Sequence, residues 1–176
     1  MLKFVSPPEG IPKGKQVFIQ YGGYSNRQLL SQYGFAILNN RYDYYSLRIE
    51  LASVYERKGL QYDSVGEVEY LEFKLKRGRL CQELMQFICT ECWDLEKSSV
   101  EEFFLSEKGD CWEKVVRRYR EMVFEELEKF ETGLEEDLRM LKEPVGYRKY
   151  FALLYRIPRK EILSEHLRLV DDELSI

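Results

Sequence analysis

The sequence predicts a mainly α-helical fold with a small β-containing region at its N-terminus. Beyond about residue 78, apolar residues recur in steps of three and four, as in amphipathic helices. Before residue 50, short runs of alternating apolar residues stand between turns rich in Gly and Pro, a pattern typical of strands. The 176 residues, 44% of them hydrophobic, suit one domain or one domain with a small appendage.

The N-terminal region contains two predicted strands and one short helix. QVFIQY (16–21) alternates β-branched or aromatic residues with polar ones, so it predicts a strand. Ser25 or Asn26 is a suitable N-cap for a helix that would end at Gly34. YYSLRIEL (44–51) is the second predicted strand.

The remainder predicts helices. RLCQELMQFICTE (79–91) places apolar side chains on one face, and SVEEFFL (99–105) begins with a Ser cap followed by acidic residues. The apolar stripe of residues 111–141 predicts one long helix, which Gly133 can bend. A further helix is expected at 147–157.

Prolines and acidic residues set further expectations in the helical part. Pro144 and Gly146 should end the long helix, and Pro158 should break the last apolar run and start a new helix, 158–170. The acidic stretch 125–137 predicts a solvated helix face. The basic run KLKRGR (74–79) predicts an exposed loop or a helix start.

Composition excludes several classes of function. A net charge of −4 gives no general attraction to nucleic acid or anionic lipid, and no apolar run approaches the roughly 20 residues that span a bilayer. The N-terminus has no signal-peptide pattern, so the four cysteines are expected to be free thiols buried in the core. Cys89 and Cys92 form a CxxC, but on a helical pattern, and no metal site is predicted.

One segment suggests a reaction. VFIQYGGYSNRQLLSQYGFAILNNRYD (17–43) resembles the last core motif of SET-domain protein methyltransferases of the Rubisco large-subunit methyltransferase type. That group includes other protein-lysine methyltransferases and an actin-histidine methyltransferase. The positions that carry the resemblance are Tyr21, Gly22, Ser25, Asn26, Leu29, Leu30, Tyr33, Gly34, Phe35, Asn39 or Asn40, and Asp43.

A second segment resembles the terminal pattern of the same family. It is FALLYRIPRKEILSEHL (151–167), in which the matching positions are Ala152, Leu153, Arg156, Lys160, Ile162 and Leu163. Pro158 and Arg159 depart from that pattern, as does Lys15 in the preceding IPKGKQ turn, where an acid is common. The resemblance implies a SET-domain remnant at 1–45 and a helical substrate-binding domain at 46–176.

The resemblance implies a protein-lysine N-methyltransferase that uses S-adenosylmethionine and recognises a protein substrate. A lysine amine, with a reference pKa of about 10.4, must lose its proton before it attacks a sulfonium methyl. A narrow channel that excludes water favours the neutral amine. By resemblance, Tyr21 is the catalytic tyrosine beside the methyl group, Tyr33 lines the lysine channel, and Phe35 packs near the cofactor.

Two motifs of the family do not appear. The early Gly-x-Gly segment and the later Asn-His motif of the cofactor pocket are absent, and the only histidine, His166, is expected on a partly buried helix face. The resemblance therefore implies that this chain alone binds no S-adenosylmethionine and is inactive, as a truncated or fragmentary form. An Asn-His motif encoded in frame upstream of Met1 would support this interpretation.

Three alternatives remain open. The chain could be a non-catalytic helical protein-interaction module or pseudoenzyme fragment, or the parent enzyme could methylate histidine. The strand 16–21 could also present an unpaired edge through which the chain associates with itself. We expect an intracellular location, in the cytoplasm or nucleus, or in the chloroplast of a photosynthetic source. The sequence identifies neither the substrate protein nor the methylation state.

Overall fold

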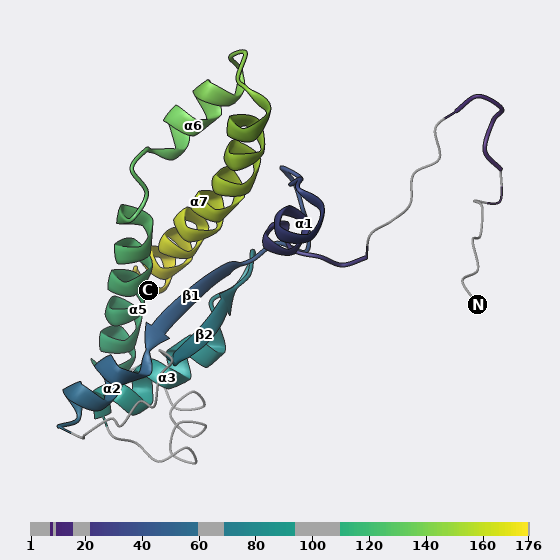
Figure 1. Cartoon of the computed structure of the whole chain (residues 1–176). Helices are drawn as coiled ribbons and strands as arrows, with labels where there is room; N and C mark the ends of the chain where they lie inside the picture. The colour runs from purple at the N-terminus through teal and green to yellow at the C-terminus, as the bar shows by residue number, and fades with distance from the viewer. Residues whose placement is uncertain (1–7, 9, 16–21, 60–68, 94–109, 176) are drawn as a thin grey trace.

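The computed structural model describes residues 8, 10–15, 22–59, 69–93 and 110–175, and every structural statement below concerns these residues. It confirms the mainly α fold with a small β part, because the described ranges form helices and a single two-stranded sheet (Figure 1). The predicted strand 16–21 and the predicted helix 99–105 lie outside the described residues. The elements are α1 (Asn26–Tyr33), β1 (Tyr45–Glu50), α2 (Leu51–Arg57), β2 (Tyr70–Leu75), α3 (Gln82–Trp93), α5 (Asp110–Glu128), α6 (Leu134–Leu141) and α7 (Tyr147–Leu174).

Helix α1 begins and ends where the sequence predicts. The Ser25 hydroxyl accepts from the amide of Gln28, and the Gln28 side chain accepts from the amide of Ser25, which together form a capping box. Gly34 ends the helix with φ 76°, and its N–H donates to the carbonyl of Leu30. A residue with a side chain would be strained at that φ, so glycine fixes this end.

The predicted strand 44–51 is confirmed as β1, which pairs with β2 in an antiparallel hairpin. The register runs from Tyr45 opposite Leu75 to Glu50 opposite Tyr70. Strand β2 contradicts part of the expectation for 74–79, since Lys74 and Leu75 belong to a strand and not to a loop or helix start. The alternation of YLEFKL, with Leu71 and Phe73 half-buried and Leu75 buried, explains the strand.

The core lies between the hairpin and the helices. Helices α5 and α7 run side by side, and α3 packs against α5 below the hairpin (Figure 1). Side chains from the sheet, α3, α5 and α7 meet in one hydrophobic cluster, and each fully buried aliphatic side chain stabilises the fold by about 1.5–3 kcal/mol. Its most deeply buried members include Leu47, Leu75, Leu84, Ile88, Val115, Tyr119, Val123, Ile162, Leu163 and Val170.

The prediction of one helix over 111–141 is wrong. Helix α5 ends at Glu128, and α6 begins at Leu134 after a break. Gly133 is the N-cap of α6 in an extended conformation, and the carbonyls of Thr132 and Gly133 accept hydrogen bonds from the buried ammonium of Lys160. The break is therefore held by a long-range partner on α7, which periodicity does not reveal.

The predicted break at Pro158 is also wrong, because α7 continues through it as one helix. Proline removes one backbone hydrogen bond and crowds the preceding turn. Buried residues on both sides, including Leu154, Ile157 and Ile162, hold the two halves in one line against α5 and α6. Tertiary burial thus outweighs the local cost of the proline.

Two expectations about exposure are corrected. The acidic stretch 125–137 is not wholly solvated, because Asp137 is fully buried. His166 is fully buried too, and not on a half-exposed face.

Cys81 and Cys89 are confirmed as buried free thiols, whereas the side chains of Cys92 and Cys111 lie outside the description. None of the described helices combines the length and apolar character needed to cross a membrane.

Candidate functional site

Helix α1 and the loop after it bring together two of the three predicted site residues. The ring centroids of Tyr33 and Phe35 lie 6.3 Å apart, and the ring of Tyr24 lies at the same distance from that of Tyr33. Tyr33 keeps 45% of its surface exposed, and Phe35 is half-buried. Tyr21 lies outside the described residues. Tyr33 and Phe35 thus form one aromatic surface at the end of α1.

The buried side chain of Asn26 holds this aromatic surface in place. Its Nδ2 donates to the carbonyl of Ile37 at 2.8 Å and to Asp43 Oδ2 at 2.9 Å. Its Oδ1 accepts from the amide of Ile37 at 2.9 Å, while its own backbone amide donates to Asp43 Oδ1 at 3.0 Å. One side chain therefore ties the start of α1 to both ends of the loop that carries Phe35.

Asn40 closes the same network. Its Nδ2 donates to the carbonyl of Tyr24 at 2.8 Å and to Asn26 Oδ1 at 3.2 Å, and its Oδ1 accepts from the amide of Tyr42. Burial raises the pKa of Asp43, although the hydrogen bonds from Asn26 and from the Tyr44 amide act in the opposite direction. These polar residues are satisfied inside the fold, so the loop has one preferred conformation.

The sequence contained these network residues but no signal for their contacts. Asn26, Asn40 and Asp43 belong to the segment whose resemblance suggested the site, yet only Tyr21, Tyr33 and Phe35 were given roles. The separation of 17 residues between Asn26 and Asp43 follows no secondary-structure period. Only the return of the loop to the start of α1 shows that they form one unit.

The site is joined firmly to the helical part of the chain. Arg27 of α1 reaches Glu72 of β2, with Nη1 and Oε1 3.4 Å apart. At the start of β1, the Tyr45 hydroxyl donates to Glu126 of α5 at 2.6 Å, and the Arg159 guanidinium of α7 lies 4.4 Å from the Tyr45 ring centre. Burial raises the pKa of the Tyr45 hydroxyl, which stays a neutral donor. Arg27 thus links α1 to the sheet, and Tyr45 links the sheet to α5 and α7.

His166 is a structural residue in this fold. Its Nδ1 accepts from the Tyr119 hydroxyl at 2.7 Å, because that hydroxyl already accepts from the Cys81 amide at 3.1 Å and must donate onward. Its Nε2 then carries the proton and donates to the carbonyl of Lys76 at 2.9 Å. Burial lowers the pKa of His166, so the neutral ring is favoured.

A cavity of about 630 Å³ lies on another part of the surface, between β2, α3 and the ends of α5 and α7. Neither Tyr33 nor Phe35 lines it, and they do not line the two smaller hollows of about 590 and 380 Å³ either. In the described ranges no three His, Cys, Asp or Glu side chains gather as a metal site would require. Tyr33 and Phe35 form an aromatic surface outside these three cavities.

Solved structures show what fold this arrangement belongs to. A structure of Rubisco LSMT bound to AdoMet superposes with a TM-score of 0.69 at 21% identity, covering 94% of this chain and 43% of that one. The SET domain of LSMT bound to methyllysine and AdoHcy gives a TM-score of 0.68 at 21% identity, with 94% and 42% covered. The chain has the Rubisco LSMT fold.

The likeness to Rubisco LSMT extends to a third structure, solved with sinefungin and monomethyllysine, which matches with a TM-score of 0.68 at 22% identity. That match covers 93% of this chain and 42% of that one, so the chain spans about two fifths of the length of these proteins. No protein-family model matches the sequence, and no curated protein is similar to it. At this level of identity the likeness establishes the fold, and the roles of Tyr21, Tyr33 and Phe35 stay predictions.

Proposed function

We propose that this chain is the C-terminal, substrate-binding part of a SET-type protein-lysine N-methyltransferase that uses S-adenosylmethionine. The observation that carries the proposal is the match of 94% of the chain to Rubisco LSMT structures bound to AdoMet or AdoHcy, one of them with methyllysine. The activity belongs to the whole protein, of which this chain resembles about two fifths.

The proposed roles of the aromatic residues follow from the chemistry of methyl transfer. Tyr21 would hold the lysine amine in line with the methyl carbon, and Tyr33 would line the channel that admits the lysine. Phe35 would pack beside the cofactor. The contact between Tyr33 and Phe35 supports this assignment, because a lysine channel and a cofactor pocket must meet at the reacting methyl group.

We also propose that the boundary between the SET remnant and the helical domain lies near residue 45. The Asn26 network ends at Asp43, whereas Tyr45 is already part of the hydrophobic core built on the helices. Residues 1–45 would complete the catalytic domain, and 46–176 would form the substrate-binding domain.

The proposal is tested by restoring the segment encoded in frame upstream of Met1. We expect S-adenosylmethionine to bind the restored protein but not the present chain, as measured by isothermal titration calorimetry. Radiolabelled methyl transfer to cell-extract proteins, followed by mass spectrometry, should find methyllysine. A restored protein that folds but does not bind S-adenosylmethionine would refute the enzymatic proposal.

Two variants of the restored protein sharpen this test. Tyr21→Phe should lower kcat by at least roughly 100-fold with little change in cofactor affinity. Phe124→Tyr, at an exposed position on α5, should change neither and serves as the control. Methylhistidine in place of methyllysine would favour the alternative histidine methyltransferase.

A second candidate is a non-catalytic protein-interaction module, favoured by the 630 Å³ cavity that lies apart from Tyr33 and Phe35. A restored protein with partner binding but no cofactor binding would support it. In that case Tyr21→Phe would leave every measured property unchanged.

A further inference from the structure

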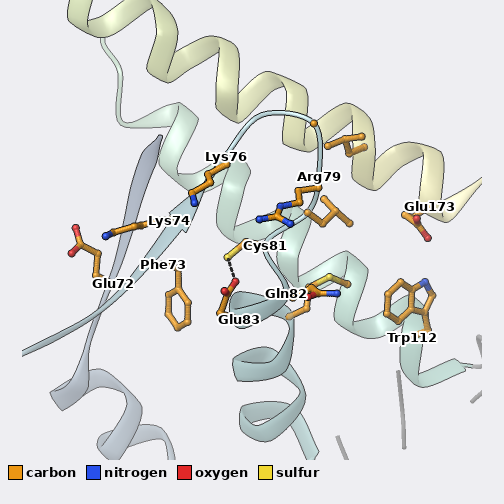
Figure 2. A pocket seen from close by; sticks show the side chains of 14 residues that line it. Glu72, Phe73, Lys74, Lys76, Arg79, Cys81, Gln82, Glu83, Trp112 and Glu173 are labelled. Atoms are coloured by element: carbon orange, nitrogen blue, oxygen red, sulfur yellow. Dashed lines mark hydrogen bonds between the residues drawn. The ribbon is translucent and has the colours of Figure 1, made fainter. Parts of the chain in front are cut away.

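The 630 Å³ cavity, called the groove below, is lined by basic, acidic and apolar side chains (Figure 2). Strand β2 and the turn after it contribute Lys74, Lys76 and Arg79. Figure 2 shows Phe73 near one end and Trp112 near the other, with Cys81 and Gln82 between them. Apolar lining comes from Phe73, Leu80, Met85, Trp112 and Leu169.

Three acidic residues, Glu72, Glu83 and Glu173, also line the groove, and the first two have hydrogen-bond partners inside the protein. Glu72 accepts from the Ser46 hydroxyl and faces Arg27 and Arg48 at 3.4 and 3.6 Å. Glu83 accepts from the Cys81 thiol at 3.3 Å. Burial raises the pKa of that thiol to about 11, so it stays neutral. Hydrogen bonds lower the pKa of Glu72 and of Glu83, and the nearby charges of Lys74 on Glu72 and of Arg79 and Lys76 on Glu83 act in the same direction.

The basic side chains are available to a ligand. Lys74, Lys76 and Arg79 are all exposed, and none forms an ion pair within the described part of the chain. The ammonium of Lys74 lies 5.2 Å from the ring centre of Tyr44. Three cations beside an apolar surface favour a ligand that carries carboxylates next to apolar groups.

The backbone of β2 adds a second feature of the groove. The Leu51 amide donates to the Glu69 carbonyl, and hydrogen-bonded positions alternate along an antiparallel pair of strands. In this register Leu71, Phe73 and Leu75 therefore exchange backbone hydrogen bonds with β1. The N–H and C=O groups of Glu72 and Lys74 therefore point away from β1, and within the described residues β2 pairs with β1 alone. An extended peptide can pair with such an edge.

We propose that the groove binds an extended acidic segment of a protein, with carboxylates on Lys74, Lys76 and Arg79 and an apolar side chain toward Phe73 and Leu80. If the proposed function holds, this segment belongs to the methylation substrate, and the groove selects proteins with acidic residues near the target lysine. The ion pair of Arg27 with Glu72 links the edge of the groove to α1, the helix that carries the predicted channel residue Tyr33 at its other end.

Direct binding to the present chain tests the groove without any catalysis. The probe is a fluorescein-labelled peptide of about six residues, roughly 20 Å when extended, in which Glu alternates with Leu and Val. We expect saturable binding by fluorescence anisotropy that weakens as salt rises, and a peptide with Lys in place of Glu should not bind. Absence of saturable binding by the acidic peptide would overturn the proposal.

Charge reversal identifies the groove as the binding surface. The triple variant Lys74→Glu, Lys76→Glu and Arg79→Glu should weaken binding by roughly tenfold or more. The matched control reverses the exposed Lys114, Lys142 and Lys149, which do not line the groove and change the net charge equally. The control should bind within about twofold of wild type, and circular dichroism confirms that both variants fold.

Three further outcomes would overturn the proposal. Equal weakening in both triple variants would mean a general charge effect. Tighter binding of single-stranded RNA than of the acidic peptide, abolished by the groove variant, would identify a nucleic-acid site instead. A dimer that the groove variant converts to monomer, seen by sedimentation, would identify a second copy of the chain as the occupant.

The same variants separate this proposal from the proposed function. If the restored protein methylates lysine but the groove variant uses every protein substrate as well as wild type does, the groove proposal alone fails. If the acidic peptide binds as expected while the restored protein binds no S-adenosylmethionine, the methyltransferase proposal alone fails.

Discussion

The buried ion pair between Lys160 and Asp137 offers the most direct test of how this fold is held together. Lys160 is 1% exposed and Asp137 is not exposed at all. Lys160 Nζ lies 2.6 Å from Asp137 Oδ2 and also donates to Thr132 Oγ1 at 3.0 Å and to the Gly133 carbonyl at 3.3 Å. Lys160→Met removes the ammonium but keeps a side chain of similar length.

The expected cost follows from the groups left behind. Arg156 and Thr132 still donate to Asp137, at 2.6 to 2.8 Å, so the carboxylate keeps part of its compensation. The carbonyls of Thr132 and Gly133 lose the donor that holds the break between α5 and α6. Breaking a buried pair from one side costs about 3–5 kcal/mol, which here lowers Tm by roughly 6–20 °C.

Urea unfolding followed by circular dichroism measures this loss. Arg117→Ala, which breaks the exposed pair with Glu113, is the control and should cost less than about 0.5 kcal/mol. The double variant Lys160→Met with Asp137→Leu should recover part of the stability, because the buried carboxylate that lost one of its two cations is removed, while Arg156, whose side chain is 32% exposed, keeps access to water. A Lys160→Met protein within about 1 kcal/mol of wild type would refute the reasoning.

Three further predictions concern buried polar groups. Tyr119→Phe leaves His166 Nδ1 without its donor and should cost about 1–3 kcal/mol in urea unfolding, whereas the same change at exposed Tyr147 should cost under about 0.5 kcal/mol. Burial lowers the pKa of His166 from 6.5, so the His166 ring binds a proton more weakly in the folded chain than in the unfolded chain. The stability that neutral His166 contributes should therefore be fully present above pH 6.5 and should be lost as the pH falls through the lowered pKa of the folded state. In unfolding free energies measured at a series of pH values, His166→Gln should abolish this pH dependence. Asn26→Asp sets a second carboxylate beside Asp43 and should cost about 2 kcal/mol or more in thermal unfolding, with part restored by Asp43→Asn; an unchanged Tm would contradict the role of this network.

Local signals in the sequence were sufficient for elements whose ends are fixed by nearby residues. The Ser25 cap, the Gly34 stop and the alternation of β1 all depend on hydrogen bonds or side chains within a few positions. The aromatic pair Tyr33 and Phe35 was found through a resemblance of segment 17–43, and the structure places the two rings together. Their chemical roles, and that of Tyr21, await the restored protein.

Sequence reasoning failed where a distant partner decided the local structure. The stripe over 111–141 has one continuous helical period, yet the chain breaks near Gly133, where a lysine from α7 binds the open carbonyls. Pro158 predicted the end of a helix, but buried side chains on both sides of it stabilise α7 as one continuous helix. Asp137 was assigned to a solvated face because its sequence neighbours are acidic, although cations from α7 surround it.

The sequence by itself determined the helical class, the capped α1, the strand β1 and the family resemblance, because these depend on residue types at short, regular spacings. Tertiary structure alone decided the buried networks of Asn26, His166 and Lys160, and it alone formed the groove beside β2. Hydrogen bonds and ion pairs between residues 17 to 90 positions apart carry no period along the chain. They exist only once the hydrophobic core has brought the hairpin and helices together.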